Sequence, residues 1–320
     1  MSEVRTTDRN LLIEYKAVRE GGVGLLDLST RGRITVSGSE AVMFLNGLIT
    51  NDMKTLGETQ SMLAAFPNVQ GRLLAVVRVI RRANDFLLDT EAATREKVIK
   101  ILERFTLAGD FKVADVTNDS ALISLQGRRA NAVVEKISAD GITVVPATHT
   151  AEAGFDLIVS EEQKDSLWQT LMAEGATPVS PEVEEILRIE AGIARYGIDM
   201  DETNVVTETN LDDAVSYTKG CYLGQEIIVR IKHRGHVAKK LTGLRFETDQ
   251  PIAAGATIRS TDDKEIGRVT SATFSPTFER TVGLGYVRYE YLTPGTPVVV
   301  AGVAAATHEL PLVRGSWYED

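Results

Sequence analysis

The pattern of the chain changes near residue 240, and this change most constrains the fold. After Leu241, short runs of β-forming residues alternate with Gly and Pro turns such as Gly255, Pro294 and Gly302. No helical period survives there, which indicates a small all-β domain. We therefore expect two parts, residues 1–240 and residues 241–320, since 320 residues exceed what one core usually supports.

Before that boundary, strands and helices are mixed. Six apolar runs have the length of strands: 32–36, 61–66, 73–80, 86–89, 121–126 and 155–159. The clearest helix covers about 91–107, where Val98, Leu102 and Phe105 share one face. Ser180 before a proline predicts a capped helix start, and a polar, irregular segment follows at 192–220. The first part is therefore expected to be α+β.

The composition excludes several functional classes. A formal net charge of −10 argues against broad nucleic-acid binding, which needs a basic surface. No run of about 18 apolar residues occurs, so no membrane-spanning helix is expected. The first ten residues lack the apolar segment of a secretory signal, and a single cysteine fits a reducing compartment. We expect a cytoplasmic monomer without nucleic-acid or membrane partners.

The only cysteine, Cys221, lies in the octet Lys219-Gly220-Cys221-Tyr222-Leu223-Gly224-Gln225-Glu226. It has no partner for an internal disulfide, so it is either a lone functional thiol or a small buried apolar residue. The neighbouring Lys219 would favour the reactive thiolate form. His233 and His236 are candidate bases for a thiol nucleophile, but they come with too few ligands for a stable metal site. No resident metal is expected.

Other segments accompany the octet in a fixed order: 44–52, 71–74, 188–202, 233–237, 267–271 and 283–287. The whole set resembles the YgfZ-type tetrahydrofolate-binding proteins, which are relatives of the glycine cleavage aminomethyltransferase (T-protein). The resemblance covers nearly the whole chain. Within it, the octet is specific to the YgfZ-type branch, whereas the other segments are shared more widely.

The resemblance implies a three-lobed ring in which two α/β lobes are interleaved in sequence and a C-terminal β-barrel completes the ring. It implies that tetrahydrofolate or a derivative binds in the central hole. It also implies a role in assembling or repairing iron–sulfur proteins, with iron–sulfur carriers or client proteins as partners. Cys221, activated by Lys219, would then be the functional thiol.

The resemblance also suggests ligand-contacting residues. Glu190 would grip the pterin, because one carboxylate can accept from the amino group and ring N–H that lie side by side. Tyr196 would stack on the pterin, and Arg195 would meet the glutamate tail. Asn68 and Gln225 are further amide candidates. Simpler roles stay open: a solvated helix-end Glu190, a packing Tyr196, an ion-paired Arg195 and a turn-forming Asn68.

One segment departs from the family pattern. T-proteins carry adjacent aspartates just after the glycines of the 71–74 segment, and one of them serves aminomethyl transfer. Here those positions are Ala75 and Val76, which cannot move a proton; a shifted alignment would instead give the role to Asp85 or Asp89. The main hypothesis is therefore folate binding in support of iron–sulfur proteins. The alternatives are a folate-dependent aminomethyltransferase, which leaves the question of an enzyme open, and a non-catalytic scaffold.

Overall fold

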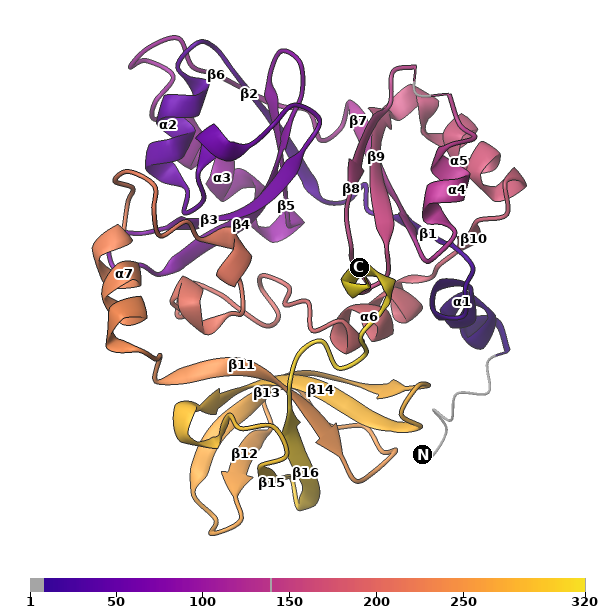
Figure 1. Cartoon of the computed structure of the whole chain (residues 1–320), viewed down its shortest axis with the longest axis vertical. Helices are drawn as coiled ribbons and strands as arrows, with labels where there is room; N and C mark the ends of the chain where they lie inside the picture. Colours follow the sequence, from indigo (N-terminus) through magenta and orange to yellow (C-terminus); the bar gives the residue numbers. More distant parts are fainter. Residues whose placement is uncertain (1–8, 139, 320) are drawn as a thin grey trace. The chain divides into compact units, whose positions relative to one another are not determined.

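The computed structural model describes residues 9–138 and 140–319 of the chain. It divides into two compact units, which are interleaved in sequence (Figure 1). Unit 1 comprises Met1–Leu28, Leu122–Ala194 and Leu241–Asp320. Unit 2 comprises Ser29–Ala121 and Arg195–Lys240. The predicted interleaving of two α/β regions is thus observed, and the octet belongs to unit 2 together with most of the irregular segment before it.

Unit 2 is built on an antiparallel sheet with the strand order β3-β4-β5-β2-β6. Its strands are β2 (Gly32–Ser37), β3 (Ser61–Pro67), β4 (Leu73–Arg81), β5 (Phe86–Thr90) and β6 (Lys112–Asp115). Its α-helices are α2 (Ala41–Leu48), α3 (Arg95–Glu103) and α7 (Gln225–Arg234). Its 3-10 turns are η1 (Met53–Thr55), η2 (Ala92–Thr94), η4 (Val206–Glu208) and η5 (Asp212–Ala214).

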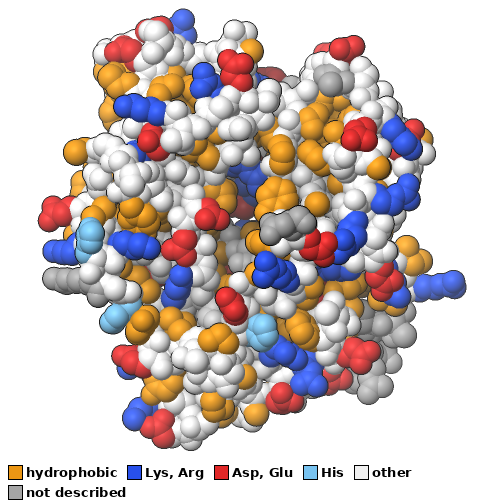
Figure 2. Space-filling view, in the orientation of Figure 1, with side chains coloured by type: hydrophobic (Ala, Val, Ile, Leu, Met, Phe, Trp, Pro, Cys, Tyr) orange, Lys and Arg blue, Asp and Glu red, His pale blue; other side chains and the backbone are white. Residues whose placement is uncertain are grey.

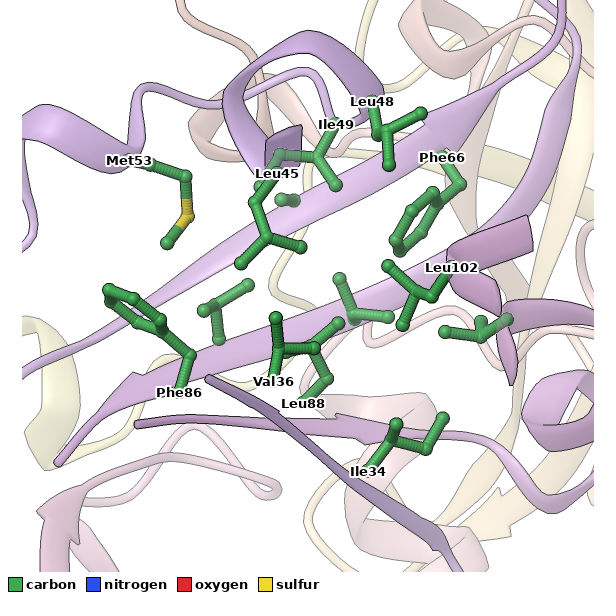
Figure 3. Packing of buried hydrophobic residues seen from close by; sticks show 14 of the residues in the cluster. Ile34, Val36, Leu45, Leu48, Ile49, Met53, Phe66, Phe86, Leu88 and Leu102 are labelled. Carbon is green, nitrogen blue, oxygen red and sulfur yellow. The ribbon is translucent and has the colours of Figure 1, made fainter. Parts of the chain in front are cut away.

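The core of unit 2 lies between this sheet and the helices α2 and α3. Alternate residues of the strands point toward the helices, as the period of two predicts. Figure 3 shows Leu45 and Leu48 of α2, Leu102 of α3, and Val36 and Leu88 of the sheet packed together. Each of these side chains is at most 8% exposed, so burial of apolar surface fixes α2 on the sheet.

Unit 1 contains a second sheet, in the order β10-β1-β7-β9-β8. Its strands are β1 (Gly24–Asp27), β7 (Ser120–Gln126), β8 (Thr143–Pro146), β9 (Gly154–Ser160) and β10 (Thr177–Pro178). Its helices are α1 (Arg9–Arg19), α4 (Ala130–Val134), the 3-10 turn η3 (Glu161–Gln163), α5 (Lys164–Ala173) and α6 (Pro181–Glu190). Strand β1 pairs parallel to β10 and antiparallel to β7.

The C-terminal part of unit 1 is a closed barrel in the order β11-β14-β13-β12-β15-β16. Its strands are β11 (Lys239–Phe246), β12 (Thr257–Ser260), β13 (Glu265–Ser275), β14 (Arg280–Arg288), β15 (Pro297–Val300) and β16 (Val303–His308). The 3-10 turns η6 (Tyr289–Tyr291) and η7 (Ser316–Tyr318) follow β14 and β16. Leu244, Phe246 and Val298 are among the side chains that fill the interior. The expected mixed α/β fold with an all-β C-terminal barrel is confirmed.

Several local predictions need correction. The helix expected over 91–107 is shorter, because residues 92–94 form a 3-10 turn and the chain leaves the helix after Glu103. The Ser180 hydroxyl donates to Glu14 of α1 at 2.6 Å instead of capping α6. Helix α1 was not expected at all, although Tyr15 and Val18 have the spacing of an apolar helix face. Over the described residues, no helix has the length and apolar character needed to cross a membrane.

Candidate functional site

The octet loop meets the C-terminal end of α2. The Lys219 ammonium group donates to the backbone oxygens of Asn46 at 2.7 Å, Ile49 at 2.9 Å and Asn51 at 2.6 Å. The backbone N–H of Leu223 donates to the Gly47 oxygen at 3.1 Å. A helix leaves its last carbonyl groups without partners, and these contacts satisfy two of them in α2. The segment 44–52 and the octet, which are far apart in the sequence, are therefore hydrogen-bonded to each other.

Lys219 is only 7% exposed, so its charge is largely removed from water. Burial lowers the pKa of the Lys219 amine to about 8, while the Asp52 carboxylate acts in the opposite direction. The ammonium nitrogen also lies 5.0 Å from the centre of the Tyr222 ring. Its three N–H donors are all committed to carbonyl groups. Any effect of Lys219 on the thiolate is therefore exerted through its charge, and the predicted activation stays a prediction.

Cys221 itself is exposed, so the interpretation as a buried apolar residue is wrong. The next residue, Tyr222, is 7% exposed, and its hydroxyl has no hydrogen-bond partner in the described part of the chain. Burial, with a further contribution from Tyr217, raises the pKa of Tyr222 to about 12. The loop therefore buries an aromatic ring and presents its thiol to solvent.

The 68–71 turn packs against the start of α7. Gly224 has φ +76°, and a Cβ atom there would lie 2.3 Å from the Asn68 oxygen, so only glycine fits. The Asn68 side-chain oxygen accepts from the backbone N–H groups of Gln70 and Arg72 at 2.8 and 2.9 Å. This is the turn-forming role left open above. Gln225, the first residue of α7, is partly buried beside this turn.

Tyr196 packs inside unit 2 and is 8% exposed. Its hydroxyl donates to the Leu73 oxygen at 3.3 Å, and the Lys97 ammonium lies 5.6 Å from the ring centre. Burial raises the pKa of Tyr196, and Lys97 opposes that shift. The backbone N–H of Arg195 donates to the Asp199 carboxylate at 3.0 Å. Both residues therefore have internal partners in unit 2, and their predicted contact with ligand stays a prediction.

Glu190 lies in unit 1 and is fully buried at 0% exposure, which excludes the solvated alternative. The Tyr15 hydroxyl donates to both carboxylate oxygens at 2.8 Å, and the Ser275 hydroxyl donates to one of them at 2.5 Å. The Arg19 guanidinium forms an ion pair with the other oxygen at 2.9 Å. These donors occupy the acceptor positions of the carboxylate. They also join α1, α6 and the barrel.

Sequence reasoning missed Tyr15 and Arg19, because α1 was not recognised. Arg19 bridges two buried carboxylates, Glu190 and Glu152, the second at 3.1 Å. Burial alone would lower the pKa of Arg19, but these carboxylates raise it above its usual value. The apolar spacing of α1 was the available signal for the helix, although not for the ion pair.

A cavity of about 530 Å³ borders this network. Tyr15, Arg19, Glu152 and Thr277 line it, together with Arg314 from the C-terminal segment. Small-molecule sites have volumes of about 300–1,000 Å³, so the size is suitable for a ligand. Glu190 does not line the cavity and lies behind Tyr15 and Arg19. Figure 2 shows that basic and acidic side chains are interspersed over the visible face, without a uniform basic surface.

Strand β4 carries no carboxylate. Ala75 is 0% exposed and belongs to the core of unit 2. Asp85 lies in the turn after β4 and pairs with Arg82 at 2.6 Å, whereas Asp89 is buried in β5 and pairs with Arg31 at 2.8 Å. Both alternative aspartates are therefore engaged in ion pairs. No group of three or more His, Cys, Asp or Glu side chains suited to a metal ion occurs in residues 9–138 and 140–319.

The fold defines a mixed α/β protein with a closed C-terminal β-barrel. Residues 5–144 and 139–219 match the GCVT N-terminal domain, and residues 239–318 match the glycine cleavage T-protein C-terminal barrel domain. The chain therefore belongs to the glycine cleavage T-protein family.

Relatives and a solved structure agree with this assignment. An aminomethyltransferase of Rubrobacter xylanophilus is 33% identical over 299 residues, covering 86% of this chain and 78% of the relative. A chloroplastic protein of Arabidopsis thaliana, named as a transferase, is 29% identical over 312 residues, covering 91% and 72%. The crystal structure of the glycine cleavage aminomethyltransferase T of Bartonella henselae superposes with a TM-score of 0.87 at 26% identity, covering 95% of this chain and 90% of that one.

Proposed function

We propose that this protein binds tetrahydrofolate or a derivative, and that Cys221 is its functional thiol in the assembly or repair of iron–sulfur proteins. Family membership supports the folate half of the proposal. The observation that carries the thiol half is the exposed Cys221 on a loop anchored to α2. Iron–sulfur carriers or client proteins would be the partners of that thiol.

Aminomethyl transfer is the second candidate, and the names of the relatives favour it over the first. The side chains of β4 weigh against it. A group that moves a proton or stabilises a cation is needed near the reacting nitrogen, and β4 offers Ala75 and Val76. The two candidates share the folate and differ in the chemistry done with it.

The residues fit a pterin at Glu190 only if an existing donor gives way. The acceptor positions of the carboxylate are occupied by Tyr15, Arg19 and Ser275. Among them, the Tyr15 hydroxyl is neutral and lies 2.6 Å from the Thr277 hydroxyl, which offers it another partner. We therefore propose that the donors of the ligand replace Tyr15. We also propose ligand contacts from four residues of unit 2: Tyr196, Arg195, Asn68 and Gln225. These contacts do not require the displacement of Tyr15 from Glu190.

Titration with tetrahydrofolate tests the folate half. Glu190→Gln keeps the shape of the side chain but adds a donor where the pterin donates. We expect binding to weaken by about 2 kcal/mol, or roughly 30-fold. Glu182→Gln, an exposed change on the same helix, should bind like the wild type. Equal affinity of Glu190→Gln and wild type would place the ligand elsewhere.

A turnover assay separates the two candidates. It supplies tetrahydrofolate and an aminomethyl donor and measures the methylene group transferred to the folate. The first candidate predicts no turnover with either the wild type or Cys221→Ala. Turnover that persists in Cys221→Ala would establish the second candidate in its place.

A further inference from the structure

The three backbone oxygens that surround the Lys219 nitrogen form a cation site. They come from Asn46, Ile49 and Asn51, at and beyond the C-terminal end of α2, at 2.6–2.9 Å from the nitrogen. Carbonyl groups at a helix C-terminus carry partial negative charge that favours a cation. An ammonium group has three N–H donors, so the number of donors and acceptors matches. We refer to these oxygens as the carbonyl cradle.

Before the octet, the Ser216 N–H donates to the Thr50 oxygen at 3.0 Å, and within the octet Lys219 makes the next attachment toward the thiol. Gly220 separates Lys219 from Cys221, and no atom lies within 4 Å of where its Cβ would be. On the other side of Cys221, the chain is held by the buried Tyr222 ring and by the Leu223 N–H bond to Gly47. Within the octet, Cys221 therefore lies between two anchors, Lys219 before it and Tyr222 with Leu223 after it.

We propose that the carbonyl cradle is a monovalent-cation site whose built-in occupant, the Lys219 ammonium group, positions the Cys221 loop on α2. Lys219 is then a positioning residue for the thiol, and this role rests on the proposed function of Cys221. A guanidinium fork or a neutral side chain cannot make three converging N–H bonds. The Asp52 carboxylate acts on the charge of Lys219, and the Lys219 nitrogen lies 5.0 Å from the centre of the Tyr222 ring.

The single cysteine makes a direct test practical, since a nitroxide spin label attaches only at Cys221. In the wild type, we expect a restricted label, because both anchors hold the loop. Lys219→Ala should increase the mobility of the label by about twofold, toward that of a free loop. Lys54→Ala is the matched control, since Lys54 is an exposed lysine just beyond α2, and it should leave the spectrum unchanged.

Chemical rescue distinguishes a cation site from simple space filling. Lys219→Ala removes three methylene groups and the ammonium group, which n-propylammonium supplies as a separate molecule. Its addition should restore the restricted spectrum with a saturable dose dependence, whereas n-propanol should not. If Lys219→Ala does not fold, Lys219→Met keeps an unbranched side chain without charge, and it should still release the label.

Three results would overturn the proposal. They are an unchanged spectrum in both Lys219 variants, equal rescue by n-propanol, and an equal change in Lys54→Ala. None of these readouts depends on folate or on an iron–sulfur protein. If Cys221→Ala kept full function, the proposed function of Cys221 would be wrong, while the spin-label results could still support the cation site. If instead the spin-label results ruled out the cation site, the proposed function of Cys221 would be unaffected.

Discussion

Replacing Glu190 by glutamine should destabilise unit 1 even without a ligand. The carboxylate is 0% exposed, and its ion-pair partner Arg19 has a side chain that is only 6% exposed. Removing one partner of a buried ion pair costs about 3–5 kcal/mol, because the other charge remains buried. Arg19 keeps its bond to Glu152, and the amide oxygen of glutamine still accepts from Tyr15 or Ser275. We therefore expect the lower end, about 3 kcal/mol.

The assay uses the two tryptophans, Trp168 and Trp317, which both lie in unit 1. Their fluorescence during urea unfolding follows this unit, and a change in midpoint at constant slope gives the loss of unfolding free energy. Glu182→Gln is the control on the exposed side of α6 and should change stability by less than about 1 kcal/mol. Equal stability of Glu190→Gln and wild type would refute the assignment of Glu190 to a buried network that holds unit 1 together.

Two further outcomes follow from the structure. Asp89→Asn should cost unit 2 about 2 kcal/mol, because Arg31 loses one of its two carboxylate partners but keeps Glu91 and is 20% exposed; circular dichroism during urea unfolding measures this, and an unchanged midpoint would contradict it. Cys221 should react with a disulfide reagent in the folded protein within about tenfold of its rate in urea, and strong protection would show that the thiol is buried.

Local pattern was sufficient for much of the fold. The Gly and Pro turns after Leu241 predicted the barrel because short strands need such turns, and the barrel strands run from Lys239 to His308. The strands β3 and β4 also follow from local spacing. These features depend on neighbours in the sequence, which is why one chain was enough to find them.

The candidate sites depend on contacts between distant residues, and the sequence could not supply these. Lys219 and Asn46 are 173 positions apart, and Tyr15 and Glu190 are 175 apart. The octet predicted that Lys219 activates Cys221, which stays a prediction, but it gave no sign that the lysine donates to backbone oxygens at and beyond the end of α2. Glu190 was selected as a ligand contact, which stays a prediction, and nothing in its own segment indicated that α1 and the barrel supply its partners.

The most direct test of the account is genetic rescue in cells that lack their own homologue of this protein. The readout is the activity of an iron–sulfur enzyme, and the variants are wild type, Cys221→Ser and Lys54→Ala at matched protein levels. The account predicts rescue by wild type and by Lys54→Ala, with at least about a tenfold loss in Cys221→Ser, because serine lacks a nucleophilic and ligating thiolate. Full rescue by Cys221→Ser would contradict it and would return the function to the folate chemistry of the aminomethyltransferases.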